Sequence, residues 1–185
     1  MRAGELLGIA GLIGSGRTEL VRAISGADPT SAGEVLLDGN VLTLKSPADA
    51  IDKGIVMVPE DRKLQGLVVE HEIGENLIYA NLDRVGTGWI TPRIKRAFTR
   101  EAIAKFGVKG RSEQPASDLS GGNQQKVVIA KWLARNPRVV VLDEPTRGID
   151  VGARAGIYDI IVGLAKSGVA VIVVSSDLEE VLGVS

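Results

Sequence analysis

The chain has 185 residues with 22 basic and 23 acidic side chains, a net charge of −1, and an apolar fraction of 44%. This profile suits one globular domain with a sizeable core, and the charge balance argues against a nucleic-acid-binding protein. The absence of cysteine excludes disulfides and thiolate metal sites. The longest apolar run, 169–174, is too short to cross a bilayer, so a membrane role would require a partner.

The first third of the chain alternates strands and helices. An apolar run that enters a glycine-rich loop predicts a strand at 5–10, and a helix follows at 18–24. Two short strands, 34–37 and 41–44, flank an Asp-Gly-Asn turn. Ser46 can cap a short helix that has proline at its first position.

The rest of the chain continues this pattern with one interruption. Apolar runs predict further strands at 55–58, 139–142 and 169–174. Periodicity and end signals predict helices at 73–82, 92–106, 123–134, 153–165 and 177–182. Apolar strands that alternate with helices indicate an α/β domain with a mainly parallel sheet flanked by helices.

The stretch at about 66–118 is mostly helical and breaks the alternation. We interpret 1–185 as a single domain, with 1–65 and 119–185 as its α/β core and about 66–118 as an inserted helical subdomain. The first predicted strand begins near residue 1, and the last helix reaches Ser185 without a cap. We therefore expect the chain to be truncated at both ends.

A glycine-rich loop connects the first predicted strand to the first predicted helix. Its candidate nucleotide-binding residues are Gly11, Gly14, Ser15, Gly16, Arg17 and Thr18. Glycines let backbone amides surround phosphate oxygens at a helix N-terminus, and the Thr18 hydroxyl suits a magnesium ion. Taken alone, the loop is also compatible with a glycine-rich turn that binds no ligand.

Two adjacent acids follow the apolar strand 139–142. Parallel sheets bind ligands at the carboxyl ends of their strands, so Asp143 and Glu144 should lie on the same edge as the glycine-rich loop. Asp143 is a candidate magnesium ligand. Glu144 is a candidate catalytic residue that polarises the water attacking a phosphoryl group. The alternative is a pair of solvated acids at a strand end.

A second anion-binding pattern opens the predicted helix 123–134. Its candidate residues are Leu119, Ser120, Gly121, Gly122, Asn123 and Gln124. A serine followed by two glycines exposes amide donors at a helix start. Because one domain rarely needs two such devices for one nucleotide, we expect this signature segment, 119–126, to bind phosphate held by another subunit.

Together these motifs carry a family resemblance. The glycine-rich loop, the signature segment, the Asp-Glu-Pro-Thr strand end and Gly148-Ile149-Asp150 occur in this order. The set resembles the nucleotide-binding domain of ABC transporters over nearly the whole chain. That resemblance implies a P-loop NTPase fold, ATP and Mg²⁺ as ligands, ATPase activity, and pairing with a second such domain, each signature closing over the other's ATP. Gly148 and Asp150 would lie in the loop that communicates across this dimer. The alternative is an ordinary helix N-cap, with Asp150 capping the helix from Val151, and both roles can hold at once.

Finer details resemble the C-terminal ATP-binding half of tandem ribose, galactose and xylose importers. They are the Gly-Arg-Thr phosphate loop, the Pro-Glu-Asp-Arg-Lys run at 59–63, and the Asn-Gln-Gln-Lys and Pro-Thr-Arg-Gly-Ile-Asp segments. The resemblance implies carbohydrate import, with transmembrane permease subunits as partners and a periplasmic or extracellular sugar-binding protein as an indirect partner. It also implies a peripheral position on the cytoplasmic face of the cell membrane.

Three candidate nucleotide-binding residues depart from the family's pattern. Arg17 replaces a lysine, Glu60 replaces a glutamine that senses magnesium and water, and Ser176 replaces a histidine that contacts the γ-phosphate. Contacts to the transition state set the rate, so we expect this site to bind ATP but turn it over slowly. The signature would then complete a partner's site. Neutral drift that leaves turnover intact is the alternative.

Two other functions fit the nucleotide motifs. One is a soluble ABC-type ATPase of DNA repair or chromosome maintenance, although such proteins separate the phosphate loop and signature by long coiled-coil or zinc-binding insertions. Here Thr18 and Leu119 are only about a hundred residues apart, without heptads or cysteines. The other is a non-catalytic module in which the bound nucleotide holds a dimer together.

Overall fold

The computed structural model describes residues 1–12, 14–30, 32–86 and 90–184. These residues form two compact units. Unit 1 comprises 1–57, 137–144 and 162–185, and unit 2 comprises 58–136 and 145–161. Ile13 in the glycine-rich loop and Ser185, where we predicted an uncapped end, lie outside the described residues. The inserted subdomain at 66–118 remains a prediction.

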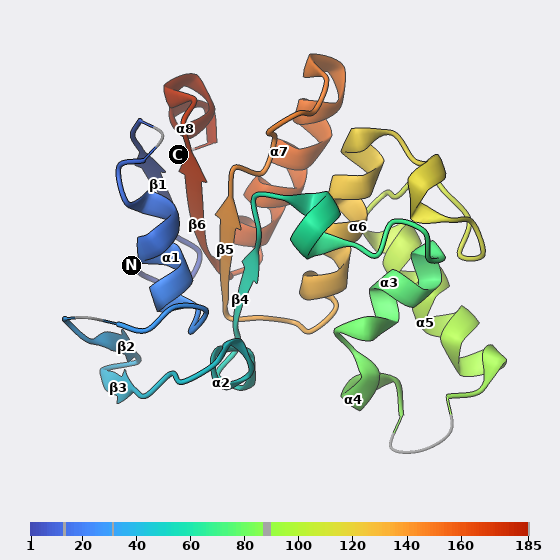
Figure 1. The fold of residues 1–185 in the computed structure, drawn as a ribbon, viewed down its shortest axis with the longest axis horizontal. Helices are drawn as coiled ribbons and strands as arrows, with labels where there is room; N and C mark the ends of the chain where they lie inside the picture. The colour runs from blue at the N-terminus through green and yellow to red at the C-terminus, as the bar shows by residue number, and fades with distance from the viewer. Residues whose placement is uncertain (13, 31, 87–89, 185) are drawn as a thin grey trace. The chain divides into compact units, whose positions relative to one another are not determined.

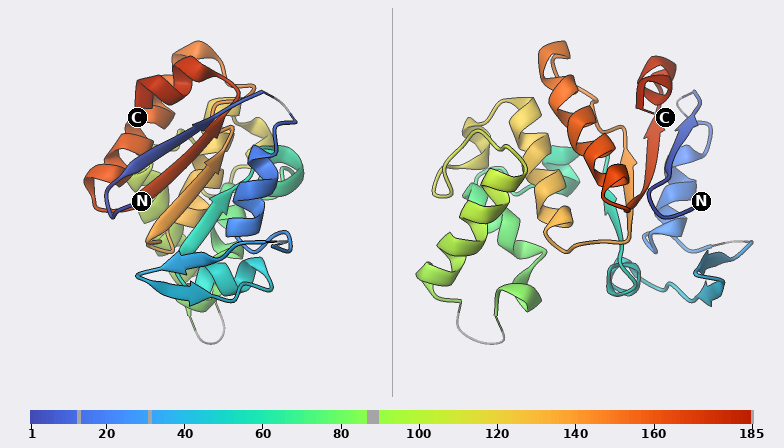
Figure 2. Two further views of the ribbon diagram at one scale, coloured as in Figure 1. Left: turned by 90° about the vertical axis from the view of Figure 1, so that its left-hand side faces the viewer. Right: turned by 180° about the vertical axis from the view of Figure 1, so that it is seen from behind.

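Unit 1 contains a four-stranded sheet, whose strands lie side by side in Figures 1 and 2. In spatial order they are β1 (Leu6–Ala10), β6 (Ala170–Ser175), β5 (Val139–Asp143) and β4 (Ile55–Val58). β1 and β5 both pair with β6 in parallel, and Val174 lies opposite Ile9 on one side and Asp143 on the other. The carboxyl ends of these three strands therefore share one edge, and the predicted α/β fold is confirmed.

The core of unit 1 forms where α1 (Arg17–Ile24) packs on the sheet. Val21 of this helix is fully buried against Val141, Ile172 and Val174. β5 and β6 are buried along nearly their whole length, as expected for apolar strands covered on both faces. α8 (Leu178–Val184) contacts β1 and β6. The packing fixes the loop before α1 next to the ends of β5 and β6.

A short hairpin and one further helix complete unit 1. Strands β2 (Val35–Leu37) and β3 (Asn40–Leu42) are antiparallel, and the turn between them has positive φ at Asp38 and Gly39. Helix α2 (Pro47–Asp52) begins as predicted, because the Ser46 hydroxyl accepts a hydrogen bond from the Asp49 amide at 3.3 Å.

Unit 2 is helical. It contains α3 (Ile73–Tyr79), α4 (Leu82–Val85), α5 (Pro92–Lys105), α6 (Gly121–Leu133), the start of α7 (Val151–Lys166), and the short helices η1 (Arg62–Gly66) and η2 (Ala116–Asp118). Helices α3, α5 and α6 contact one another. Within these helices Ile73, Leu77, Val127 and Ile129 are fully buried. None of the helices in the described ranges is long and apolar enough to cross a membrane.

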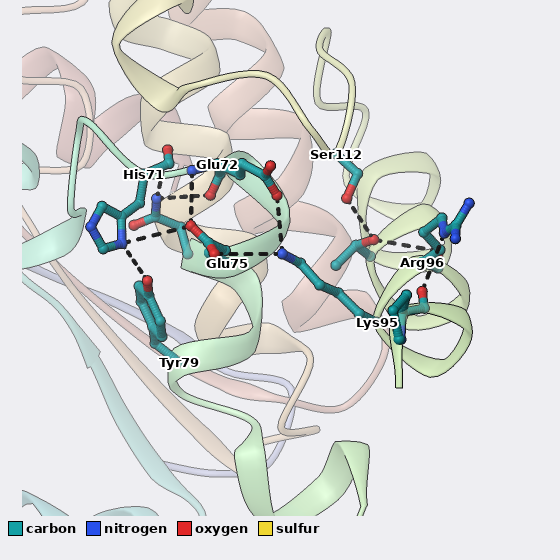
Figure 3. Close-up of polar contacts among 10 residues, drawn as sticks. His71, Glu72, Glu75, Tyr79, Lys95, Arg96 and Ser112 are labelled. Carbon is teal, nitrogen blue, oxygen red and sulfur yellow. Dashed lines mark hydrogen bonds and ion pairs between the residues drawn. The ribbon is translucent and has the colours of Figure 1, made fainter. Parts of the chain in front are cut away.

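Polar contacts join α3 to α5 on the surface of unit 2 (Figure 3). The ammonium of Lys95 lies 3.0 Å from Glu72 and 3.6 Å from Glu75. The imidazole of His71 pairs with the Tyr79 hydroxyl and lies 3.7 Å from Glu75. His71 is exposed. Surface ion pairs of this kind contribute little to the free energy of unfolding, so we assign these contacts no role beyond joining α3 and α5.

The predicted helix 73–82 is too long, since α3 ends at Tyr79. Buried Asn81 causes this end. Its side-chain amide donates to the carbonyls of Leu77 and Lys131, each at 2.8 Å, and so satisfies one of the last carbonyls of α3. The chain then starts α4 at Leu82. A contact with α6, distant in sequence, therefore sets this boundary.

Candidate functional site

The glycine-rich loop has the backbone that phosphate binding requires. Gly14 and Gly16 have φ values of 81° and 85°, in the left-handed region that favours glycine, and Gly16 is the N-cap of α1. A Cβ on Gly11 would lie 2.9 Å from the Ser15 hydroxyl. Glycine at these positions lets the chain turn tightly at the start of α1, where amide donors favour an anion.

Arg17 folds back over this loop toward the neighbouring strand ends. Its guanidinium donates a hydrogen bond to the Ser175 carbonyl, and its Nη2 lies 3.5 Å from Oε1 of Glu144. The side chains of Arg17 and Glu144 are only 10% and 11% exposed, so water screens this pair weakly. The guanidinium is thus bound to two groups of this chain, the Ser175 carbonyl and the Glu144 carboxylate.

The Glu144 carboxylate has further donors. Its Oε1 accepts a hydrogen bond from the Ser176 amide at 2.7 Å, and its Oε2 accepts one from the Ser176 hydroxyl at 3.2 Å. The Glu144 backbone has φ of 47°, which is strained for a residue other than glycine, and its amide donates to the Val174 carbonyl at 2.8 Å. The contacts with Ser176 and Arg17 hold the carboxylate in place despite this strain.

Asp143 and Thr18 form the candidate metal site. The Thr18 hydroxyl lies 3.4 Å from Oδ1 of Asp143, while Oδ2 is buried and has no hydrogen-bond partner among the described residues. Burial raises the pKa of the Asp143 carboxyl, and the Thr18 hydrogen bond opposes this effect. An unpartnered buried carboxylate oxygen beside a hydroxyl fits a hard cation such as Mg²⁺. No group of three or more acidic, His or Cys side chains suited to a metal occurs in the described ranges.

The signature segment opens α6 in unit 2. Ser120 is its exposed N-cap, and the Ser120 hydroxyl accepts a hydrogen bond from the Asn123 side chain at 3.0 Å. Buried Gln124 donates to the Ala116 carbonyl at 3.1 Å, and Leu119 is also buried. These contacts leave Ser120 at the surface, which is compatible with the predicted role toward a partner's phosphate.

The two signature glycines are required by close neighbours. A Cβ on Gly122 would lie 2.7 Å from the Ala153 Cβ, and a Cβ on Gly121 would lie 2.9 Å from an Nη atom of Arg62. Gly148 has φ of 65°, and Asp150 caps α7 through a 2.9 Å bond from the Ala153 amide, as predicted. The start of α6 and the loop before α7 are therefore packed together.

Glu60 also lies in unit 2, where its carboxylate forms an ion pair with Arg147. Arg62 donates to the carbonyls of Arg147 and Gly148. The sequence alone assigns no role to Arg62 or Arg147, because nothing local indicates which distant carbonyls or acids they meet. The only available signal was the charged run that follows the buried strand β4.

The candidate residues thus fall into two groups. Unit 1 brings together the phosphate loop and the two strand ends, namely Gly11, Gly14, Ser15, Gly16, Arg17, Thr18, Asp143, Glu144 and Ser176. Unit 2 holds Glu60, the signature residues and the 148–150 loop. The assignment of these residues to nucleotide, metal or partner remains a prediction.

Comparison with known proteins decides the family. A sequence model described as "ABC transporter" matches residues 1–147. The chain belongs to the ABC transporter family. This ATP-binding cassette is 49% identical over 187 residues to "Ribose import ATP-binding protein RbsA" of Geobacillus kaustophilus, covering 100% of the chain and 38% of that protein. It is 51% identical to the protein of the same name from Halalkalibacterium halodurans, with the same coverage. The predicted family is confirmed.

Solved structures agree on the fold. A crystal structure of an ATP-binding cassette of an ABC transporter in its ADP conformation superposes with a TM-score of 0.81 at 25% identity. The match covers 98% of this chain and 74% of that one. The chain thus spans 38% of the length of its curated relatives and most of one cassette.

Proposed function

We propose that this cassette binds and hydrolyses ATP to energise carbohydrate import, and that it is the half with a degenerate site of its own. The relatives named ribose import ATP-binding proteins support a sugar as cargo, at about half identity over the whole chain. Its partners would be a second ATP-binding domain and transmembrane permease subunits, with an extracellular or periplasmic sugar-binding protein acting indirectly. It would lie on the cytoplasmic face of the membrane, with the 66–118 subdomain toward the permease.

The proposal of a degenerate site rests on the contacts that surround the Glu144 carboxylate. A carboxylate has about four lone-pair sites. The Ser176 amide and hydroxyl occupy two of them at 2.7 and 3.2 Å, and Arg17 approaches a third at 3.5 Å. Little capacity remains for Glu144 to accept a hydrogen bond from an attacking water. Slow turnover at this site follows.

The other residues of unit 1 retain a binding role. The backbone amides of the 14–16 loop would surround the phosphates of ATP. Thr18 and Asp143 would hold Mg²⁺, which supplies charge neutralisation on the phosphates when bound. In unit 2, the Ser120 hydroxyl and the amides that follow it would contact the ATP of the partner domain. Binding at one site and catalytic assistance at the other are thus separate tasks of one cassette.

Two substitutions in the complete ATPase test this division. Ser120→Arg places a bulky charge at an exposed N-cap without disturbing the core, and should reduce steady-state ATP hydrolysis at least about tenfold. Glu144→Gln should retain more than half of the parent's steady-state ATP hydrolysis. Ser117→Arg and Glu179→Gln alter exposed residues of the same types and serve as controls. Loss of activity in Glu144→Gln with retention in Ser120→Arg would contradict the proposal.

Cargo is tested separately by uptake. Cells that depend on this transporter should lose accumulation of a labelled monosaccharide when Ser120→Arg replaces the parent protein. A panel of pentoses and hexoses would identify the sugar. Unchanged uptake of every sugar in the panel, with ATP hydrolysis abolished, would remove carbohydrate import from the proposal while leaving the ATPase assignment intact.

A further inference from the structure

Arg62 joins three segments of unit 2 through one guanidinium group. Its Nη1 donates to the Arg147 carbonyl at 2.9 Å, and its Nη2 donates to the Gly148 carbonyl at 3.3 Å. Its Nε lies 3.5 Å from the side-chain oxygen of Gln124. The segment that follows β4, the start of α6 and the loop before α7 therefore meet at a single side chain.

The glycines around Arg62 leave space for this group. A Cβ on Gly121 would lie 2.9 Å from Nη2 of Arg62 and 3.4 Å from the Gly148 carbonyl oxygen. A Cβ on Gly148 would lie 3.7 Å from Nη1. The positive φ of Gly148, 65°, contributes to the turn of the 147–148 backbone at this point. The guanidinium thus packs between the signature segment and the loop that precedes α7.

The helix η1, which carries Arg62, is itself fixed on α6. The Asp61 carboxylate caps it by accepting from the amides of Lys63 and Leu64 at 2.9 and 3.0 Å. At its other end, the buried Lys131 ammonium donates to the Gly66 carbonyl. A Cβ on Gly66 would lie only 2.9 Å from Val128. Both ends of η1 are held, so the backbone position from which the Arg62 side chain extends is fixed.

The loop that receives Arg62 has a second attachment to the same segment. The Arg147 side chain forms an ion pair with Glu60, while the Arg147 carbonyl accepts from Arg62. The side chain and the backbone of one residue are therefore bound to positions two residues apart. This double attachment restricts both the translation and the rotation of the 147–148 peptide.

We propose that Arg62 is a positioning residue that fixes the 147–148 loop against the start of the signature helix. The proposal rests on the proposed function, because both segments would act on the ATP of the partner domain. A planar fork can serve two adjacent carbonyls at once, whereas a lysine ammonium acts as a point donor. Loss of the fork should therefore disturb turnover without changing how the cassette's own phosphate loop binds nucleotide.

The test compares Arg62→Lys and Arg62→Ala with the exposed neighbour change Lys63→Ala, all in the complete ATPase. We expect kcat to fall about tenfold in Arg62→Ala and by less in Arg62→Lys, because a charged donor is lost or misplaced. The dissociation constant for a fluorescent ATP analogue should stay within about twofold, since the phosphate loop is untouched. Lys63→Ala should match the parent in both measurements.

Hydrogen exchange gives a readout that does not depend on catalysis. The Ile149 amide donates to the Thr146 carbonyl at 3.1 Å, and it should exchange faster in both Arg62 variants than in the parent. Arg62→Lys keeps the positive charge, so it keeps the proposal testable if Arg62→Ala fails to fold. Unchanged exchange at Ile149 together with parental kcat in both variants would overturn the proposal. A parent protein without ATPase activity would instead remove the proposed function, and faster exchange would still support the positioning role.

Discussion

Replacement of Arg17 by lysine should raise turnover at the cassette's own site. In the structure, the guanidinium lies 3.5 Å from Glu144, and both side chains are about nine-tenths buried, at 10% and 11% exposed. It also donates to the Ser175 carbonyl, which holds it in this orientation. A lysine ammonium lacks the fork needed to serve both acceptors. The change should therefore free one lone-pair site on Oε1 of Glu144 for water, while Ser176 still donates to both oxygens.

The size of the effect follows from the geometry of the contact. A well-aligned charge-assisted hydrogen bond contributes roughly 1.5–3 kcal/mol, and each 1.4 kcal/mol corresponds to about tenfold in rate. Because the Arg17–Glu144 contact is long at 3.5 Å and lysine keeps the charge, we expect an effect near or somewhat below the lower end of this range. Turnover should rise about five- to thirtyfold if about 1–2 kcal/mol is released.

The assay isolates this site by combining Arg17→Lys with Ser120→Arg, which disables the partner's site. Residual ATP hydrolysis of the double variant is compared with that of Ser120→Arg alone. Arg22→Lys is the matched control, because Arg22 lies in the same helix and binds Asp28 through two bonds of 2.7 Å. If Arg17→Lys leaves residual hydrolysis unchanged or lowers it, the account of Glu144 is wrong.

Two further predictions concern buried charges. Burial raises the pKa of Asp143, so its ionised form destabilises the fold above the unfolded-state value of 3.8. Asp143→Asn should therefore raise the Tm without ligand near pH 7, and it should abolish the additional Tm increase that Mg²⁺ gives with ATP. The stabilisation without ligand should shrink as pH falls toward 4. A Tm advantage of Asp143→Asn that does not depend on pH would contradict this prediction. Burial also lowers the pKa of Lys131 from 10.5 to about 8, so the unfolded chain binds the extra proton between these values. In urea unfolding, Lys131→Met should be more stable than the parent at pH 7, and up to about 3 kcal/mol of that gain should be lost by pH 10.5. An equal difference in stability at both pH values would contradict this prediction.

The sequence predicted the sheet well, because its signals are local. The apolar runs became β1, β5 and β6 with ends shifted by no more than a residue or so. The Ser46 and Asp150 caps also formed as expected, since a cap depends only on residues three positions away. Family motifs in their order were sufficient to identify the ABC transporter family.

Long-range contacts were beyond reach of the same reasoning. The end of α3 depends on Asn81 meeting the Lys131 carbonyl, and the position of Arg62 depends on carbonyls 85 and 86 residues away. The three departures at positions 17, 60 and 176 were visible in the sequence. That Arg17 and Ser176 both bind Glu144 was not, because the side-chain directions arise only when β1, β5 and β6 assemble.

Vanadate trapping tests the central claim most directly, since it captures nucleotide at the site that hydrolyses it. The complete ATPase would be incubated with photoreactive azido-ATP, magnesium and vanadate, cross-linked, and digested to locate the label. We predict labelled peptides from the partner domain, lost in Ser120→Arg, with little label on this cassette. Equal trapping on this cassette, unaffected by Ser120→Arg, would contradict the division of tasks between its phosphate loop and its signature.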